Sequence, residues 1–72
     1  MPKRYSSKQI QKVLGKLDFE VVGQKGSHLK FRDGRGTTTI LKAKQKVIRQ
    51  GTFLEILKQV GVSKQEFEKL VK

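Results

Sequence analysis

One segment of the chain combines residue types that could act on a phosphodiester. His28 is the single histidine of the sequence, and Lys25 and Lys30 flank it. A neutral imidazole can act as a general base toward a ribose 2′-hydroxyl, and nearby lysines can neutralise charge that develops on the phosphoryl oxygens. Because only RNA carries the 2′-hydroxyl, this chemistry would restrict the substrate to RNA. The segment is therefore compatible with metal-independent RNA cleavage at His28.

The same residues have a simpler interpretation. A lone histidine on the surface of a basic domain is usually solvated or contacts phosphate without catalysis. A second proton-transfer group is not evident, because there is no other histidine and the single tyrosine, Tyr5, precedes the first predicted helix. Residue chemistry alone favours a nucleic-acid-binding module over an enzyme.

The charge of the chain favours a polyanionic partner. The 72 residues include 17 Lys and Arg against 6 Asp and Glu, a formal net charge of +11. Such a field attracts nucleic acid and accelerates its binding. Nucleic acid is the first choice of partner and an acidic protein the second. A membrane surface is third, because no predicted helix is both strongly basic and broadly apolar.

Length and composition exclude several other classes. The chain is long enough for one domain, residues 1–72, and the absence of cysteine excludes disulfides, Cys-ligated zinc and a thiol nucleophile. One histidine and few acids predict no metal and no other cofactor. No apolar run reaches the roughly 20 residues of a membrane span, and the basic residues 1–8 lead into no apolar signal region. We therefore expect a soluble, cytoplasmic protein.

Apolar periodicity and capping residues predict three helices. The first covers residues 8–17 and follows an N-cap at Ser6-Ser7. Thr52 to Glu55 has the pattern of a capping box that opens a second helix, and Gly61 is expected to end it in a left-handed conformation. Ser63 to Glu66 has the same capping pattern and opens a short C-terminal helix.

Three short strands are predicted, over residues 19–24, 27–32 and 36–41. Apolar and polar residues alternate in the second, and β-favouring residues are frequent in the first and third. Lys25-Gly26 indicates the first turn. Asp33-Gly34 indicates a tight hairpin turn in which both residues tolerate positive φ. Lys42 to Gln50 is expected to be a basic surface loop.

The predicted order is α-β-β-β-α plus a terminal helix, which favours an α+β two-layer sandwich. The connections between strands are too short for crossovers, so the sheet should be an antiparallel meander. Both main helices should bury their apolar stripes on the same face of the sheet. The other face would then be open and basic, with His28, Lys30 and Arg32 on it. Phe31, Phe53 and Phe67 fall in apolar stripes, and Phe19 stands at a strand start; all four are predicted to pack in the core rather than stack on bases.

Three segments together resemble the HicA toxins of HicA–HicB type II toxin–antitoxin pairs. They are Ser6-Ser7-Lys8 at a helix start, QKGSHLKF at residues 24–31, and GTFLEILKQVGVS at residues 51–63. The resemblance runs from about Lys3 to Phe67. It implies a double-stranded-RNA-binding-domain-like fold and ribosome-independent cleavage of mRNA. It also implies a HicB-type antitoxin as partner and, by motif position, His28 as the catalytic residue.

The chain departs from the family pattern at one position. Many HicA toxins carry a second histidine, often followed by proline, at the end of the third strand, where this sequence has Lys42-Ala43. Lysine can hold a phosphate but is a poor base near neutral pH. Beside catalytic His28, the candidate RNA-binding residues are Lys25, Gly26, Ser27, Lys30, Arg32, Lys42 and Lys44.

Three hypotheses about function follow. The first is a metal-independent endoribonuclease toxin that cleaves mRNA and is covered by a HicB-type antitoxin. The second is a non-catalytic RNA- or DNA-binding module on the same fold, with backbone contacts from the basic loop, including Lys46 and Arg49. The third is an adaptor for an acidic protein, which makes no use of the Gly26-Ser27-His28 segment.

Overall fold

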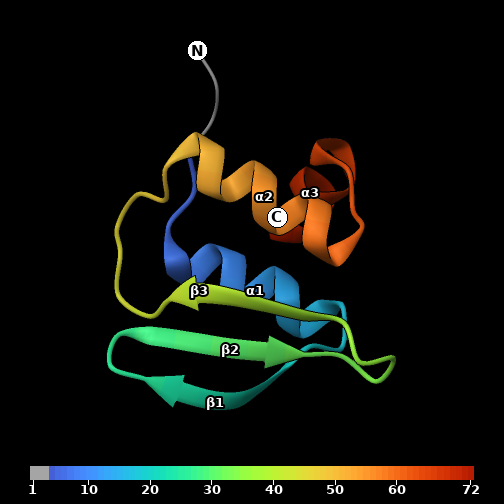
Figure 1. Cartoon of the computed structure of the whole chain (residues 1–72). Coiled ribbons are helices and arrows are strands. Elements are labelled where there is room, and N and C mark those ends of the chain that lie inside the picture. Colours follow the sequence, from blue (N-terminus) through green and yellow to red (C-terminus); the bar gives the residue numbers. More distant parts are fainter. Residues whose placement is uncertain (1–3) are drawn as a thin grey trace.

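The computed structural model describes residues 4–72; residues 1–3, where the basic N-terminal segment and the family resemblance begin, lie outside the described part. Six elements follow in the order α-β-β-β-α-α: α1 Ser7–Lys16, β1 Glu20–Lys25, β2 His28–Arg32, β3 Thr38–Lys42, α2 Gln50–Val60 and α3 Lys64–Val71. The strands form one antiparallel sheet in the order β1-β2-β3. The helices gather on one side of the sheet, with α2 next to β3 (Figure 1). This is the predicted α+β two-layer fold.

The first helix forms as predicted, one residue earlier at each end. Its apolar stripe is buried, with Ile10, Val13 and Leu14 at most 2% exposed. Ser6 is the N-cap and exchanges hydrogen bonds with Gln9 in a capping box. The helix therefore has both a satisfied N-terminus and a face to bury, the two features that stabilise a short amphipathic helix.

The end of α1 contains the one non-glycine residue with positive φ in residues 4–72. Asp18 has φ of 65°, and the chain turns there so that the Phe19 amide donates to the Leu14 carbonyl at 2.9 Å. Glycine adopts this left-handed conformation without the steric cost that a Cβ brings. Asp18→Gly should therefore raise the free energy of unfolding by about 0.5–1 kcal/mol, measured by urea denaturation.

A matched control for this prediction lies within the same helix. Lys12 is exposed in the middle of α1, where glycine only adds backbone freedom. Lys12→Gly should destabilise the protein by about 1 kcal/mol. Equal destabilisation by both variants would contradict the interpretation of Asp18 as a left-handed helix terminus.

The first hairpin turn is confirmed. Lys25 pairs with His28, so Gly26 and Ser27 form a two-residue turn, and Gly26 has φ of 60°. Positive φ at the first central residue is typical of the turns that suit the twist of antiparallel strands.

The prediction of the second hairpin turn is wrong. Asp33-Gly34 does not form a two-residue turn; residues 33–37 form a longer loop in which positive φ falls at Gly36. The Asp33 carboxylate accepts hydrogen bonds from the amides of Arg35 at 3.0 Å and Thr37 at 2.8 Å. Aspartate thus stabilises the longer loop through its side chain.

The longer loop decides which side chains of β3 face the core. A two-residue turn at 33–34 would pair Arg32 with Arg35 and turn Leu41 toward the open face. In the observed register Leu41 pairs with Leu29, and its side chain is 1% exposed. Burial of Leu41 therefore favours the longer loop, and β3 covers residues 38–42 rather than 36–41.

The capping box predicted for the second helix is also wrong. α2 begins at Gln50, so Thr52 and Glu55 lie inside it, and its N-cap, Arg49, makes no side-chain capping bond. The preceding Ile48 is buried, at 2% exposure, and its amide donates to the Tyr5 carbonyl at 2.8 Å. Burial of an isoleucine stabilises by about 1.5–3 kcal/mol, more than a typical cap of about 1 kcal/mol. The segment of residues 42–50, predicted as a surface loop, thus contributes Ile48 to the core and ends at Arg49, because α2 begins at Gln50.

At the C-terminal end of the fold the helix boundary at Gly61 agrees with the prediction, and the capping box predicted at Ser63 to Glu66 forms only in part. Gly61 ends α2 with φ of 77°, and the Ser63 hydroxyl caps α3 by accepting from the Glu66 amide at 3.1 Å. Phe67 packs against Tyr5 and Phe53, with ring centroids 4.7 and 4.9 Å away. All four phenylalanines are buried, as predicted: Phe19, Phe31, Phe53 and Phe67.

Candidate nucleic-acid interface

The sheet face that the helices leave uncovered carries the predicted basic side chains. Along β2, Leu29 and Phe31 point into the core, whereas His28, Lys30 and Arg32 are exposed. The alternation follows from the two-residue period of a strand. The structure therefore confirms an open face with His28 on it.

The strand register places His28 between two lysines. Lys25 of β1 and Lys42 of β3 are its direct cross-strand partners. Residues paired in this way have Cα atoms about 4.5–5.5 Å apart and point their side chains to the same face. The side chains of Lys25, His28 and Lys42, one from each strand, thus form a row across the sheet, and all three are exposed.

His28 also opens onto a hollow that the sequence did not indicate. The hollow has a volume of about 320 Å³ and lies where the sheet edge meets the start of α2. Its lining residues are His28, Ile40, Lys42, Gln45, Ile48, Arg49 and Thr52. Arg49 adds a third cation near the histidine, and the uncapped first turn of α2 adds backbone N–H donors. No sequence signal placed Gln45 or Thr52 at this site, since only the tertiary fold brings them to His28.

Ser7 holds the end of β3 in place. This serine is 1% exposed, and its hydroxyl donates to the Lys42 carbonyl. Gln11 donates to the Ser7 hydroxyl at 2.9 Å and to the Ala43 carbonyl at 3.2 Å. The Ala43 amide in turn donates to the carbonyl of Ser27 at 2.6 Å. The Ser6-Ser7 sequence predicts only an N-cap, and this positioning role depends on contacts that the tertiary fold makes.

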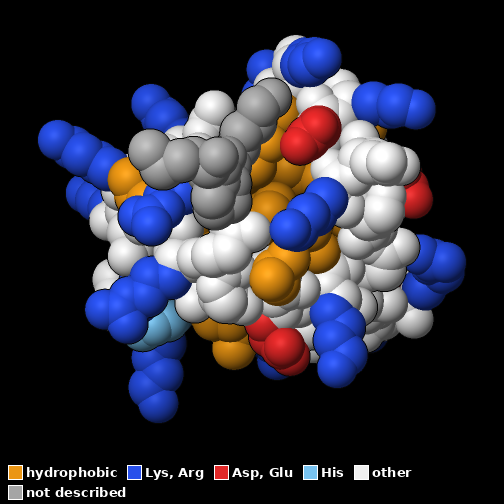
Figure 2. Space-filling model, turned by 90° about the horizontal axis from the view of Figure 1, so that it is seen from above, with side chains coloured by type: hydrophobic (Ala, Val, Ile, Leu, Met, Phe, Trp, Pro, Cys, Tyr) orange, Lys and Arg blue, Asp and Glu red, His pale blue; other side chains and the backbone are white. Residues whose placement is uncertain are grey.

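The remaining candidate residues lie farther along the surface. Arg32 stands at the other end of β2, paired with Glu20, and lines a hollow with Asp18 and Asp33. Lys44 lies in the segment between β3 and α2. It lines a different hollow, beside the start of α1, together with Lys8 and Lys46. The open face therefore has a basic end around His28 and an acidic end around Arg32. Figure 2 shows Lys and Arg side chains gathered around the histidine.

Fold and site together define a class: a small basic α+β domain that presents a histidine and several cations on an uncovered sheet face. Residues 7–62, well over half of the chain, match the model of a family described as the HicA toxin of bacterial toxin–antitoxin systems. The chain belongs to the HicA toxin family and is the toxin component of a toxin–antitoxin system. Toxins of this family generally cleave mRNA. No curated protein matches the chain.

The family assignment agrees with the resemblance carried by the Gly-Ser-His and Gly-Thr segments: the first lies within the matched residues, and so does the second except for its last residue, Ser63. It implies an antitoxin as partner. Within residues 4–72, no helix is long and apolar enough to cross a membrane.

Proposed function

We propose that residues 1–72 form a single RNA-binding and ribonuclease domain that cleaves mRNA in the cytoplasm with His28 as its catalytic residue. The observation that carries the proposal is the exposed position of His28 between Lys25 and Lys42, on a sheet face that no element of residues 4–72 covers. Membership of a toxin family that generally cleaves mRNA supports the same conclusion.

In the proposed mechanism, the 2′-oxygen of a ribose attacks the adjacent phosphorus. The neutral imidazole of His28 takes the 2′-hydroxyl proton, the bond from phosphorus to the 5′-oxygen breaks, and the leaving oxygen takes a proton from the solvent that reaches this open face. The products are a 2′,3′-cyclic phosphate and a 5′-hydroxyl. Lys25 and Lys42 stabilise the additional negative charge on the phosphoryl oxygens in the transition state.

The proposed reaction takes its nucleophile from the substrate's own 2′-hydroxyl, so it includes no metal ion or other cofactor. The lysines beside His28 provide positive charge at the place where a metal would otherwise act as a Lewis acid.

RNA binding is assigned to the basic end of the open face. Lys42 and Arg49 line the hollow at His28. Lys25 pairs with His28 from the neighbouring strand, and Gly26-Ser27 forms the turn between them. Lys30 and Lys44 extend the basic surface in two directions from this centre. Arg32 belongs to the same predicted set but contributes less, because Glu20, Asp18 and Asp33 surround it and repel phosphate.

We further propose that the antitoxin is of the HicB type and covers the face around His28. A chain with a net charge of +11 favours a partner surface that is acidic. An antitoxin placed there would exclude RNA and block the catalytic histidine at the same time.

The test of the proposed chemistry is incubation of the purified protein with labelled RNA in EDTA. We expect cleavage, with 2′,3′-cyclic phosphate ends, because the nucleophile is the substrate's own 2′-hydroxyl. An oligonucleotide of the same sequence with 2′-deoxy sugars should bind but stay intact. Cleavage of the deoxy strand would refute this mechanism, and binding without any cleavage of RNA would favour a non-catalytic binding module.

A further inference from the structure

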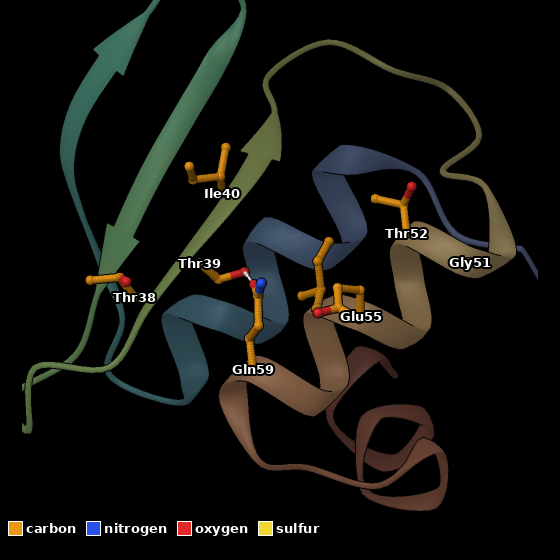
Figure 3. A pocket seen from close by; sticks show the side chains of 8 residues that line it. Thr38, Thr39, Ile40, Gly51, Thr52, Glu55 and Gln59 are labelled. Atoms are coloured by element: carbon orange, nitrogen blue, oxygen red, sulfur yellow. Dashed lines mark hydrogen bonds between the residues drawn. The ribbon is translucent and has the colours of Figure 1, made fainter.

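A second hollow continues from the one at His28. It has a volume of about 510 Å³ and lies between β3 and α2 (Figure 3). Ile40 and Thr52 line both hollows, so the two lie next to each other. An RNA strand with a phosphate at His28 therefore has room for a neighbouring nucleotide in this second hollow, which we call the Glu55 groove.

The lining of the Glu55 groove differs from that of the basic hollow. No lysine or arginine lines it; it presents the hydroxyls of Thr38 and Thr52, the side chains of Glu55 and Gln59, and the aliphatic surfaces of Ile40 and Ile56. A phosphate would meet a carboxylate there and be repelled. Apolar walls with a few convergent polar groups instead suit a nucleobase.

The position of Glu55 is not explained by its sequence context. Its predicted capping role is lost, since α2 begins at Gln50, and within residues 4–72 it takes part in no ion pair. The other five acids lie elsewhere: Asp18, Glu20 and Asp33 at the far end of the sheet, and Glu66 and Glu68 on α3. A carboxylate next to an RNA path weakens binding unless it accepts hydrogen bonds from the RNA.

Gln59 provides the complementary donor. The Thr39 hydroxyl donates to its Oε1 at 2.6 Å, which orients the amide and leaves both N–H groups of Nε2 available. Glu55 and Gln59 are four residues apart, so they lie on the same face of α2, about 5–6 Å apart at their Cβ atoms. The groove therefore presents a carboxylate acceptor and an amide donor side by side (Figure 3).

We propose that the Glu55 groove binds a guanine base next to the scissile phosphate; this inference rests on the proposed RNA-cleaving function. Guanine carries two adjacent donors, N1–H and N2–H, on its Watson–Crick edge, followed by the O6 acceptor. Glu55 accepts from both donors and the Gln59 amide donates to O6. Adenine, cytosine and uracil have no two adjacent donors on that edge, so the carboxylate discriminates against them.

The test is binding of uncleavable 2′-O-methyl hexanucleotides to the full-length protein, followed by fluorescence anisotropy. Three oligonucleotides share a uridine background and carry one guanine, one inosine or one adenine. Inosine lacks only the N2 amino group, so it removes one of the two bonds to Glu55. We expect the guanine oligonucleotide to bind about fivefold or more tightly than either of the others.

Two variants test whether Glu55 is responsible for the preference for guanine. Glu55→Gln should bind the guanine and inosine oligonucleotides with equal affinity, because its side chain offers one acceptor and one donor in place of two adjacent acceptors. Glu68→Gln removes the same charge from an exposed site on α3 and should keep the guanine preference. Both changes are at exposed positions, and equal melting temperatures will show that folding is intact.

Each contrary result has its own meaning. Equal binding of guanine and inosine by the unmodified protein, or a guanine preference that persists in Glu55→Gln, would overturn the guanine site while leaving the ribonuclease proposal standing. Failure of every oligonucleotide to bind would overturn both proposals. Loss of antitoxin binding by Glu55→Gln with the guanine preference unchanged would overturn the proposal in favour of a protein contact.

Discussion

His28→Ala is expected to abolish RNA cleavage and to leave RNA binding nearly intact. General base catalysis by a positioned side chain contributes about 10²- to 10⁴-fold to rate, and within residues 4–72 no other histidine can take over the role. The side chain is exposed, so its removal leaves no cavity in the core. Cleavage rates from a labelled RNA in EDTA, together with dissociation constants from the same preparations, separate the two effects.

The control for this variant uses the same strand. Lys30→Ala removes an exposed cation two residues away on the same face. It should weaken RNA binding several-fold, since phosphate contacts dominate affinity. It should leave the cleavage rate at saturating RNA nearly unchanged. Full cleavage by His28→Ala would refute the catalytic role of His28 whatever the binding data show.

Lys42→Ala is expected to slow cleavage by about 10²-fold, the loss typical of removing one group that stabilises transition-state charge. The residue is paired with His28 across the sheet. Single-turnover cleavage at saturating RNA measures this effect separately from binding. Lys42→Arg keeps the positive charge and should restore part of the rate.

Arg32→Ala provides the matched comparison for Lys42→Ala. Both positions are exposed cations at strand ends on the same sheet face, but Arg32 is paired with Glu20 rather than with His28. We expect a change of less than about threefold in the cleavage rate for Arg32→Ala. If both variants lose activity equally, charge over the whole face matters more than proximity to His28, and the assignment of Lys42 to the transition state is wrong.

The sequence predicted those features of the fold that depend on neighbouring residues. The alternation from His28 to Arg32 was sufficient to place the histidine on the open face. Periodic apolar residues identified all three helices and the buried phenylalanines. The first hairpin was also predictable, because Gly26 allows a two-residue turn locally. Local steric preferences and hydrophobic periodicity are properties of short segments, so they can be recognised without knowledge of the rest of the chain.

The site was predictable only in part. His28 and its basic neighbours Lys25 and Lys30 lie close in sequence, and the family resemblance pointed to the histidine directly. The hollow beside it could not be foreseen, because Arg49 and Thr52 reach it from a helix more than twenty residues away. The helix start was also misplaced, because the burial of Ile48 outweighed the local capping pattern.

The register of β3 shows most clearly what only the tertiary structure decided. With the tight turn predicted at Asp33-Gly34, His28 would face Thr39 and Leu41 would be turned to the open face. The observed loop instead pairs His28 with Lys42 and buries Leu41. The sequence by itself determined that this protein has a basic open sheet face with a histidine on it. The packing of Leu41 in the core decided that Lys42 of β3 stands opposite that histidine. The strand register that turns Leu41 toward the core also sets which residue of β3 faces His28 on the open side.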